Sequence, residues 1–158
     1  MIAAITPLVD ESGCSIWSPP PVKSHDCRAL VETRGSARLR RVLLIDDTPE
    51  IAELLTFALR DLGHEVFAQG YSDAVNELIA EHHPDALVLD CSAFEMSESL
   101  FDMVRQHPDH ADLPVVIITD TPELADPSLS KRKARKVLVV PKPFTASQVT
   151  TALEQLLG

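Results

Sequence analysis

Four separate apolar runs, each ending at a polar residue, constrain the fold of this chain more than any other feature. Each run is short, nearly continuous and rich in β-branched residues, which is typical of a strand buried on both faces of a parallel sheet. In an open parallel sheet the ligand crevice lies outside the carboxyl ends of the strands. The polar residues that follow the runs would therefore meet at one edge. The runs are Val42–Ile45 before Asp46 and Asp47, Ala86–Leu89 before Asp90, Val115–Ile118 before Thr119, and Val137–Val140 before Pro141 and Lys142.

Helical patterns separate these runs. Thr48 is suited to cap a first helix that Gly63 ends, and Ser72 is suited to cap a second. Pro122 and Pro127 fall where a fourth helix should run, so we expect that helix to be short or to start late. With a further short strand at residues 65–68, strand and helix alternate five times. This order predicts an α/β fold, a flavodoxin-like, doubly wound sheet of five parallel strands with helices on both faces.

Charge and composition divide the 158-residue chain in two. Residues 1–40 carry a balance of +1, contain the run Pro19–Pro21 and show no sustained period, which predicts a flexible N-terminal extension. Residues 41–158 carry nine basic and twenty acidic side chains, a balance of −11, and are expected to form the folded domain. The net charge of −10 argues against general binding to nucleic acid or to anionic membranes.

The cysteines and the apolar runs indicate a cytoplasmic setting. Cys14, Cys27 and Cys91 are odd in number, and their spacing matches no disulfide framework, which favours a reducing compartment. The N-terminus lacks the basic region of a signal peptide, and no apolar run approaches the length of a membrane span.

The carboxylates predicted to share one edge of the sheet have the chemistry of a magnesium site. Three carboxylates held close together repel one another, so a divalent cation would stabilise them. Mg²⁺ takes oxygen ligands and keeps several waters. We therefore expect Asp46, Asp47 and Asp90 to bind Mg²⁺, with the backbone carbonyl of Ser92 as a further ligand.

The same edge is suited to phosphoryl chemistry. A carboxylate can attack phosphorus and form an acyl phosphate, and Asp90, on the middle strand, has neighbours on both sides. The hydroxyl of Thr119 can donate a hydrogen bond to a phosphoryl oxygen, and the ammonium of Lys142 can neutralise another. Each of these residues alone would more simply be a turn, cap or surface residue. Together, and in this order, they favour the functional interpretation.

These residues resemble the receiver domain of two-component response regulators, over about residues 41–158. The motifs that carry the resemblance are Leu44-Ile45-Asp46-Asp47, Leu87-Val88-Leu89-Asp90, Ile117-Ile118-Thr119 and Pro141-Lys142-Pro143-Phe144. The resemblance implies that Asp90 is the phospho-acceptor and that Asp46 and Asp47 hold magnesium. It also implies that Thr119 and Lys142 contact the phosphoryl group, and it makes the Lys142-Pro143 bond a candidate for the cis form.

The chain departs from the pattern of that family in three places. Val139 stands where the family usually has a switch aromatic, which puts output by that route in doubt. Asp120 follows Thr119, where a small residue is usual, and would either alter metal affinity or point away. The stretch at 91–97, after Asp90, has neither the proline nor the later glycine that the family usually has there, so this loop is expected to differ.

Residues 131–136 carry five cations in six positions, and without them residues 41–158 would stand at −16. We interpret that run first as a solvated face and second as a contact for an acidic partner or nucleic acid.

The resemblance implies a stand-alone response regulator rather than a turnover enzyme. Its partners would be a sensor histidine kinase or phosphotransfer protein and a downstream protein target, with no nucleic acid and no membrane. A homodimer through the face formed by the fourth and fifth helices is a further expectation. One alternative is a receiver-like interaction module that works without phosphorylation, which Val139 and Asp120 favour. A magnesium-dependent phosphohydrolase is a second alternative, but the sequence has no insertion long enough for a substrate-binding cap.

Overall fold

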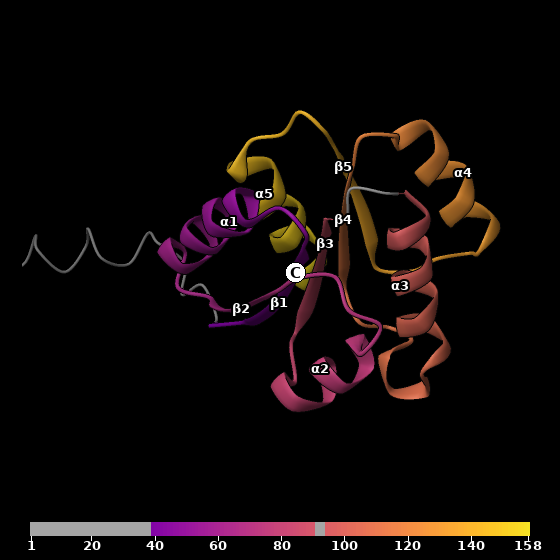
Figure 1. The fold of residues 1–158 in the computed structure, drawn as a ribbon, viewed down its shortest axis with the longest axis horizontal. Helices are drawn as coiled ribbons and strands as arrows, with labels where there is room; N and C mark the ends of the chain where they lie inside the picture. The colour runs from indigo at the N-terminus through magenta and orange to yellow at the C-terminus, as the bar shows by residue number, and fades with distance from the viewer. Residues whose placement is uncertain (1–38, 91–93) are drawn as a thin grey trace, which may run out of the picture. The chain divides into compact units, whose positions relative to one another are not determined.

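The structure is a computed structural model that describes residues 39–90 and 94–158, and Figure 1 shows its elements. The predicted extension, its cysteines, and Cys91 and Ser92 therefore lie outside the described residues, apart from residues 39 and 40. Strands and helices alternate throughout the described part. The strands are β1 (Arg41–Asp46), β2 (Glu65–Gln69), β3 (Ala86–Asp90), β4 (Val115–Thr119) and β5 (Val137–Pro141). The helices are α1 (Pro49–Asp61), α2 (Val75–His82), α3 (Phe94–Gln106), the 3₁₀ turn η1 (Pro108–His110), α4 (Pro122–Lys131) and α5 (Ala146–Leu157).

All five strands are parallel and lie in the order β2-β1-β3-β4-β5. This order confirms the predicted flavodoxin-like, doubly wound fold, and it places β3 at the centre of the sheet. The carboxyl ends of the strands therefore meet at one edge, as the apolar runs predicted. Among the described residues no helix is both long enough and apolar enough to cross a membrane.

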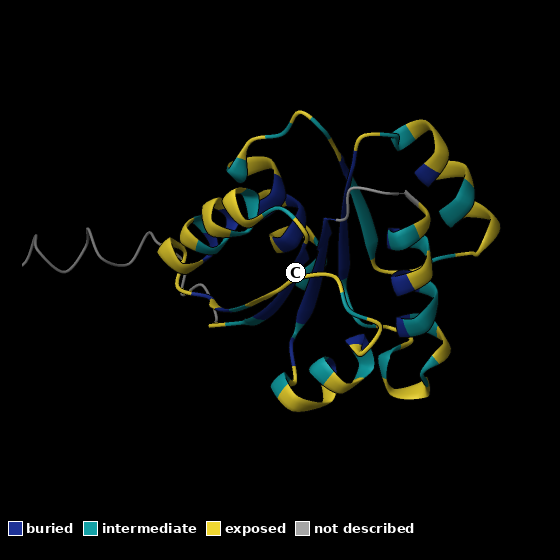
Figure 2. Cartoon of the chain, in the orientation of Figure 1, coloured by how far each residue is buried: buried dark blue, intermediate teal, exposed yellow. Residues whose placement is uncertain are grey.

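Successive side chains along a strand point to opposite faces of the sheet and so enter two separate hydrophobic cores. Figure 2 shows the central strands as the buried centre of the domain. On one face of the sheet, Leu44 and Val88 pack with apolar residues of α1 and α5. On the other face, Ile45 and Leu89 pack with apolar residues of α2 and α3. Because both faces are covered, the central strands β1, β3 and β4 are apolar at every position of their buried runs, up to the polar residue with which each strand ends.

Helix starts were predicted less accurately than strands. Thr48 is the N-cap residue of α1, but its side chain makes no capping hydrogen bond. The prediction that Ser72 caps α2 is wrong, because the N-cap residue is Ala74, whose N–H donates to the Ser72 hydroxyl. The start of α5 has a full capping box, in which Thr145 and Gln148 satisfy each other's backbone N–H groups.

Of the two outcomes expected for α4, the late start is wrong, whereas the helix is indeed shorter than α1, α3 and α5. Helix α4 begins at Pro122 and runs for 10 residues. Pro122 fits the first turn, where its missing N–H would have had no partner, whereas Pro127 lies inside the helix and removes one internal hydrogen bond. Ala125 is the buried residue of α4, so this helix has little apolar surface to hold it against the sheet.

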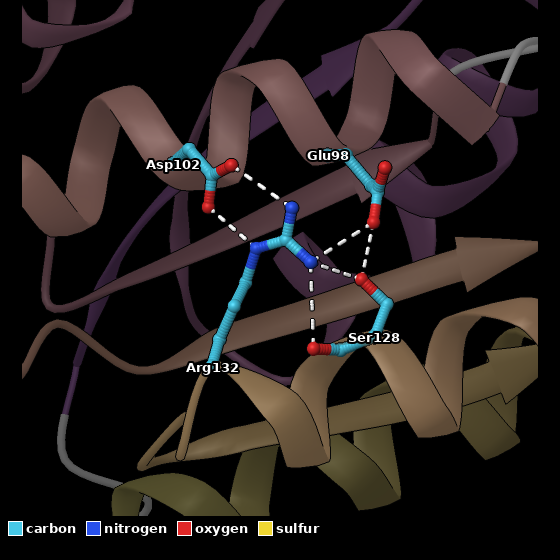
Figure 3. Close-up of polar contacts among 4 residues, drawn as sticks. All are labelled: Glu98, Asp102, Ser128 and Arg132. Atoms are coloured by element: carbon cyan, nitrogen blue, oxygen red, sulfur yellow. Dashed lines mark hydrogen bonds and ion pairs between the residues drawn. The ribbon is translucent and has the colours of Figure 1, made fainter.

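A polar cluster fastens α4 to α3, and Figure 3 shows it. The guanidinium of Arg132 donates two hydrogen bonds to the carboxylate of Asp102, at 2.7 and 3.0 Å, and one to Glu98 at 3.0 Å. The hydroxyl of Ser128 donates to Glu98 and also contacts Arg132. We call these four residues the α3–α4 clasp. Bidentate pairing of this kind fixes geometry as well as charge, so it supplements the small apolar face of α4.

Candidate functional site

The predicted site residues lie together where the strands end. Asp46 and Asp90 are direct partners in the pairing of β1 with β3, so their Cα atoms lie about 4.8 Å apart, the usual spacing of neighbouring strands. Thr119 ends β4, on the other side of Asp90, and is directly paired with Pro141 of β5. We call the set Asp46, Asp47, Asp90, Thr119 and Lys142 the carboxylate edge.

Asp90 is the most deeply buried charged residue of this edge. Its side chain is 1% exposed, and the Nζ atom of Lys142 lies 2.7 Å from its Oδ1 atom. Its Oδ2 atom is buried and has no hydrogen-bond partner among the described residues. Burial raises the pKa of Asp90 above the ordinary aspartate value, although the Lys142 ammonium opposes that shift. The pair therefore leaves one carboxylate oxygen of Asp90 uncompensated.

Lys142 is held in place by the backbone on both sides of it. Its N–H donates to the carbonyl of Thr119 at 2.8 Å, and the Lys142-Pro143 peptide bond is cis, the form for which the family resemblance made it a candidate. Burial alone would lower the pKa of Lys142, but the carboxylates of Asp90, Asp120 and Asp46 together raise it. Lys142 therefore carries its positive charge at neutral pH, directly beside the predicted acceptor.

Asp46 is 4% exposed and is anchored by one oxygen only. Its Oδ1 atom accepts a hydrogen bond from the N–H of Thr48 at 2.7 Å, while its Oδ2 atom is buried without a partner among the described residues. Burial raises the pKa of Asp46 to about 6, and the neighbouring Asp90 adds to the rise, although the Thr48 hydrogen bond opposes it. A bound cation would therefore stabilise the charged form of the Asp46 carboxylate.

Thr119 is buried at the end of β4, and its hydroxyl takes part in a local turn. The N–H of Thr121 donates to the Thr119 Oγ1 atom at 3.1 Å, and the two threonine hydroxyls lie 3.3 Å apart. In the backbone contact the Thr119 hydroxyl is the acceptor, so its proton is free whenever the Thr121 hydroxyl acts as the donor in the contact between the two side chains. It is thus suited to donate to an oxygen placed on Asp90.

The described residues fit a magnesium ion through acidic oxygens rather than through a closed cage. No group of three or more histidine, cysteine, aspartate or glutamate side chains in the described ranges lies close enough to enclose a metal. Mg²⁺ often takes only one or two carboxylates and keeps its waters, and the unpartnered Oδ2 atoms of Asp46 and Asp90 are oxygens of that kind. Asp47 is exposed beside them, and Ser92 lies outside the described residues.

Asp120 and Val139 show what the two departures from the family pattern do. Asp120 does not point away from the site, because its Oδ2 atom lies 3.7 Å from the Nζ atom of Lys142, although its side chain is 64% exposed. Asp120 therefore competes with Asp90 for the same ammonium. Val139 is half-buried on β5 and lines an open pocket between β5 and α5, together with Leu138 and Gln148.

Sequence reasoning missed an apolar surface beside the carboxylate edge. An open pocket next to Lys142 is lined by Ile51 and Leu54 of α1 and by Phe144. Leu54 is 52% exposed and Phe57, also on α1, is 69% exposed. The signal was present in the helical spacing, because Leu54 and Phe57 lie off the face that carries the buried residues of α1.

Comparison with protein families and with curated relatives identifies the class of domain. The model of the response regulator receiver domain matches residues 42–154. The probable transcriptional regulatory protein TcrX of Mycobacterium tuberculosis is 29% identical over 116 residues, which are 73% of this chain and 49% of that protein. The DNA-binding response regulator MtrA of Mycolicibacterium smegmatis is 26% identical over 118 residues, 75% of this chain and 50% of that protein. The chain thus spans about half the length of these relatives.

Solved structures share the fold. A putative response regulator from Chloroflexus aurantiacus has a TM-score of 0.65 and 25% identity, covering 76% of this chain and 98% of that one. The receiver domain of a sensor histidine kinase from Pseudomonas aeruginosa, which has a magnesium ion coordinated in its active-site cleft, has a TM-score of 0.62 and 20% identity. It covers 76% of this chain and 98% of its own.

Proposed function

We propose that this chain, which belongs to the family of response regulator receiver domains, accepts a phosphoryl group on Asp90 and signals by binding a protein target. The observation that carries the proposal is the environment of Asp90. Its carboxylate lies at the end of the central strand, with one oxygen 2.7 Å from the Lys142 ammonium and the other buried without a partner among the described residues. A free oxygen beside a fixed cation is the arrangement that attack on phosphorus requires.

The donor would be a phosphohistidine of a sensor histidine kinase or a phosphotransfer protein. A carboxylate oxygen of Asp90 attacks the phosphorus atom, so that an O–P bond forms and the N–P bond breaks. The electron pair of the broken bond stays on the imidazole nitrogen, which takes up a proton. Lys142 and the Thr119 hydroxyl neutralise the phosphoryl oxygens, and hydrolysis of the acyl phosphate later restores Asp90 without a separate substrate. The domain would thus be a signalling acceptor rather than an enzyme with turnover of a substrate.

Magnesium is the cofactor that these residues would hold. Asp46, Asp47, Asp90 and the backbone carbonyl of Ser92 are the proposed ligands. Bound Mg²⁺ would offset the negative charge of the carboxylates and of the incoming phosphoryl group. Support comes from the two unpartnered carboxylate oxygens and from the magnesium ion in the cleft of the Pseudomonas aeruginosa receiver domain.

The apolar surface of α1 supports a protein donor. Leu54 is exposed in the pocket beside Lys142, and Phe57 is exposed further along the same helix, where a small phosphodonor would have no use for them. We expect Phe57→Ser to leave the rate of phosphorylation by acetyl phosphate unchanged. The same substitution should slow transfer from any phosphotransfer protein that phosphorylates the unmodified chain, because that protein docks on α1.

Output by protein binding is the finer part of the proposal. The two curated relatives are named as a transcriptional regulator and a DNA-binding regulator, but this chain covers only about half of each. Within the described residues, the charge balance favours a protein target over nucleic acid. A homodimer through α4 and α5 stays a prediction, which light scattering of the phosphorylated and unphosphorylated chain would test.

A phosphorylation-independent interaction module is the second candidate. Val139 cannot move between buried and exposed positions as a switch aromatic does. Asp120 forms an ion pair with the same Lys142 ammonium as Asp90. If this candidate is correct, a partner captured by the chain will bind the Asp90→Asn variant as tightly as it binds the phosphorylated chain.

Incubation with acetyl phosphate and Mg²⁺, followed by intact-mass measurement, tests the phospho-acceptor proposal. The unmodified chain should gain one phosphoryl group, and acetate is the leaving group in this reaction. Asp90→Asn should gain none, whereas the matched control Asp126→Asn, on the exposed face of α4, should gain one. A chain that gains nothing even in rapid-quench samples, or an Asp90→Asn variant that gains as much, would contradict the proposal.

A further inference from the structure

Five cations follow one another at residues 131–136, and the structure separates one of them from the other four. Arg132 belongs to the α3–α4 clasp, where its guanidinium forms ion pairs with Glu98 and Asp102 (Figure 3). The remaining four are exposed, and none of them has an ion pair within the described residues. We call this set the basic loop: Lys131, Lys133, Arg135 and Lys136.

The basic loop remains unpaired although anions are abundant. Residues 41–158 carry twenty acidic side chains, and only nine basic ones. A chain with that excess could pair four more cations internally, yet these four, at the amino ends of β4 and β5, make no ion pair with any residue at positions 39–90 or 94–158. The amino ends of the strands form the edge of the sheet opposite to the carboxylate edge, so the two sites are independent.

The backbone of the basic loop is held in a fixed shape. Lys133 and Lys136 have φ values of 51° and 50°, in the left-handed region that favours glycine. Lys133 ends α4 in a Schellman arrangement, because its N–H donates to Ser130 and the N–H of Ala134 donates to Leu129. A loop selected only for solubility would gain stability from glycine at these two positions, so lysine there indicates a use for the charge.

Arg105 of α3 anchors the backbone of the basic loop. Its guanidinium donates to the carbonyls of Leu113 at 2.7 Å, His110 at 3.1 Å and Arg135 at 2.9 Å. Burial lowers the pKa of Arg105 below the ordinary arginine value, and the carboxylate of Asp112 opposes that shift. Because the carbonyl of Arg135 is bound inward, the chain of the loop is anchored while its cationic side chains face outward. A preorganised charged surface loses less entropy when a partner binds.

The basic loop borders an open pocket of about 430 Å³. The pocket is lined by apolar atoms of Phe101, Ala111 and Ala134, and by the cationic residues Lys133 and Arg135. Asp102 and Asp112 also lie on its rim. Apolar lining residues can pack against apolar side chains of a bound segment, and the cations beside them can pair with its carboxylates.

We propose that the basic loop and this pocket form a docking surface for an acidic segment of a partner protein. The proposal concerns a surface away from the carboxylate edge and does not depend on phosphorylation. A nucleic acid fits less well, because the rest of residues 41–158 stands at −16 and would repel a long phosphate backbone over more of its surface than it would repel a short acidic segment. A membrane fits less well too, because none of the exposed large apolar residues in the described ranges belongs to this loop.

Fluorescence anisotropy of a labelled peptide of alternating glutamate and leucine, roughly ten residues long, tests the proposal on the full chain. The peptide should bind at low salt and lose about tenfold in affinity at physiological salt, because exposed charges are screened. The combined variant Lys131→Gln, Lys133→Gln, Arg135→Gln and Lys136→Gln should bind the acidic peptide at least about tenfold more weakly than the unmodified chain does. A peptide with glutamine in place of glutamate should not bind.

Two controls keep the outcome interpretable. The matched variant Arg40→Gln with Arg60→Gln removes two cations elsewhere and should bind the acidic peptide as the unmodified chain does. Thermal melting shows whether the fourfold variant is folded, and if it is not, Arg135→Gln with Lys136→Gln replaces it. No binding of the acidic peptide, equal binding by a folded loop variant, or tighter binding of a DNA duplex or of anionic vesicles would each overturn the proposal.

Discussion

The carboxylate edge and the α3–α4 clasp treat charge in opposite ways. In the clasp, one arginine meets two carboxylates and a hydroxyl, and every charged group has a partner of opposite sign. At the carboxylate edge, Asp46 and Asp90 are more deeply buried, yet each keeps an oxygen without a partner among the described residues. Buried groups left unsatisfied lower stability, so a protein keeps them where they serve a function. We therefore interpret the clasp as scaffold and the carboxylate edge as the proposed site.

The largest expected effect comes from making Asp46 neutral. Its folded pKa of about 6 exceeds the unfolded value of 3.8, so its contribution to stability is complete below pH 3.8 and is lost as pH rises through about 6. We predict that Asp46→Asn raises the free energy of unfolding at neutral pH, without metal, by up to about 3 kcal/mol. Urea denaturation between pH 4 and pH 8 measures this, and the fall should be smaller in the variant, because only the part due to Asp90 remains. A parallel fall in both proteins would contradict the assignment.

The next effect comes from removing the cation of the same site. Lys142→Met leaves the Asp90 carboxylate buried without its partner, and we expect a loss of about 2 kcal/mol at pH 7.5. The loss should shrink at pH 5, because the pKa of Asp90 is already raised by burial and would rise further without Lys142. Denaturation at the two pH values measures the difference. An equal loss at both would mean that the lysine stem acts through packing alone.

A smaller effect is expected from breaking the clasp. Arg132→Ala leaves Glu98 and Asp102 facing each other, and it should destabilise the domain by about 1–2 kcal/mol, since the network is partly exposed to solvent. Hydrogen exchange should increase in α4, which has Pro127 inside it and little apolar surface to hold it. Lys131→Ala, one residue away, is the matched control and should change stability by less than about 0.5 kcal/mol. Equal effects of the two substitutions would remove the distinction between them.

The sequence was most informative where a rule acts over a few residues. Continuous apolar runs predicted the strands, and the parallel order then brought Asp46, Asp90, Thr119 and Lys142 to one edge. The structure added what depends on distant residues. Arg132 meets partners 30 and 34 positions away, and no local pattern predicts such a contact. The orientation of Asp120 toward Lys142 and the early start of α4 at Pro122 also depend on tertiary packing rather than on propensity.

One proposed metal ligand lies beyond the described ranges, and Mg²⁺ binding by substituted chains tests it. That ligand is the backbone carbonyl of Ser92. Because a backbone carbonyl survives substitution of the side chain, Ser92→Ala should keep Mg²⁺ binding. Asp47→Asn should weaken it, since that change removes a proposed ligand.

Thermal melting with and without Mg²⁺ at pH 7.5 tests the contrast between site and scaffold most directly. Mg²⁺ should raise the melting temperature of the unmodified chain by several degrees, since a ligand that binds the folded state stabilises it. Asp46→Asn should melt higher than the unmodified chain without metal and should lose the Mg²⁺ effect, whereas Asp102→Asn should melt lower and keep it. The central claim would be contradicted if Mg²⁺ had no effect on the unmodified chain, or if Asp102→Asn abolished the effect and Asp46→Asn preserved it.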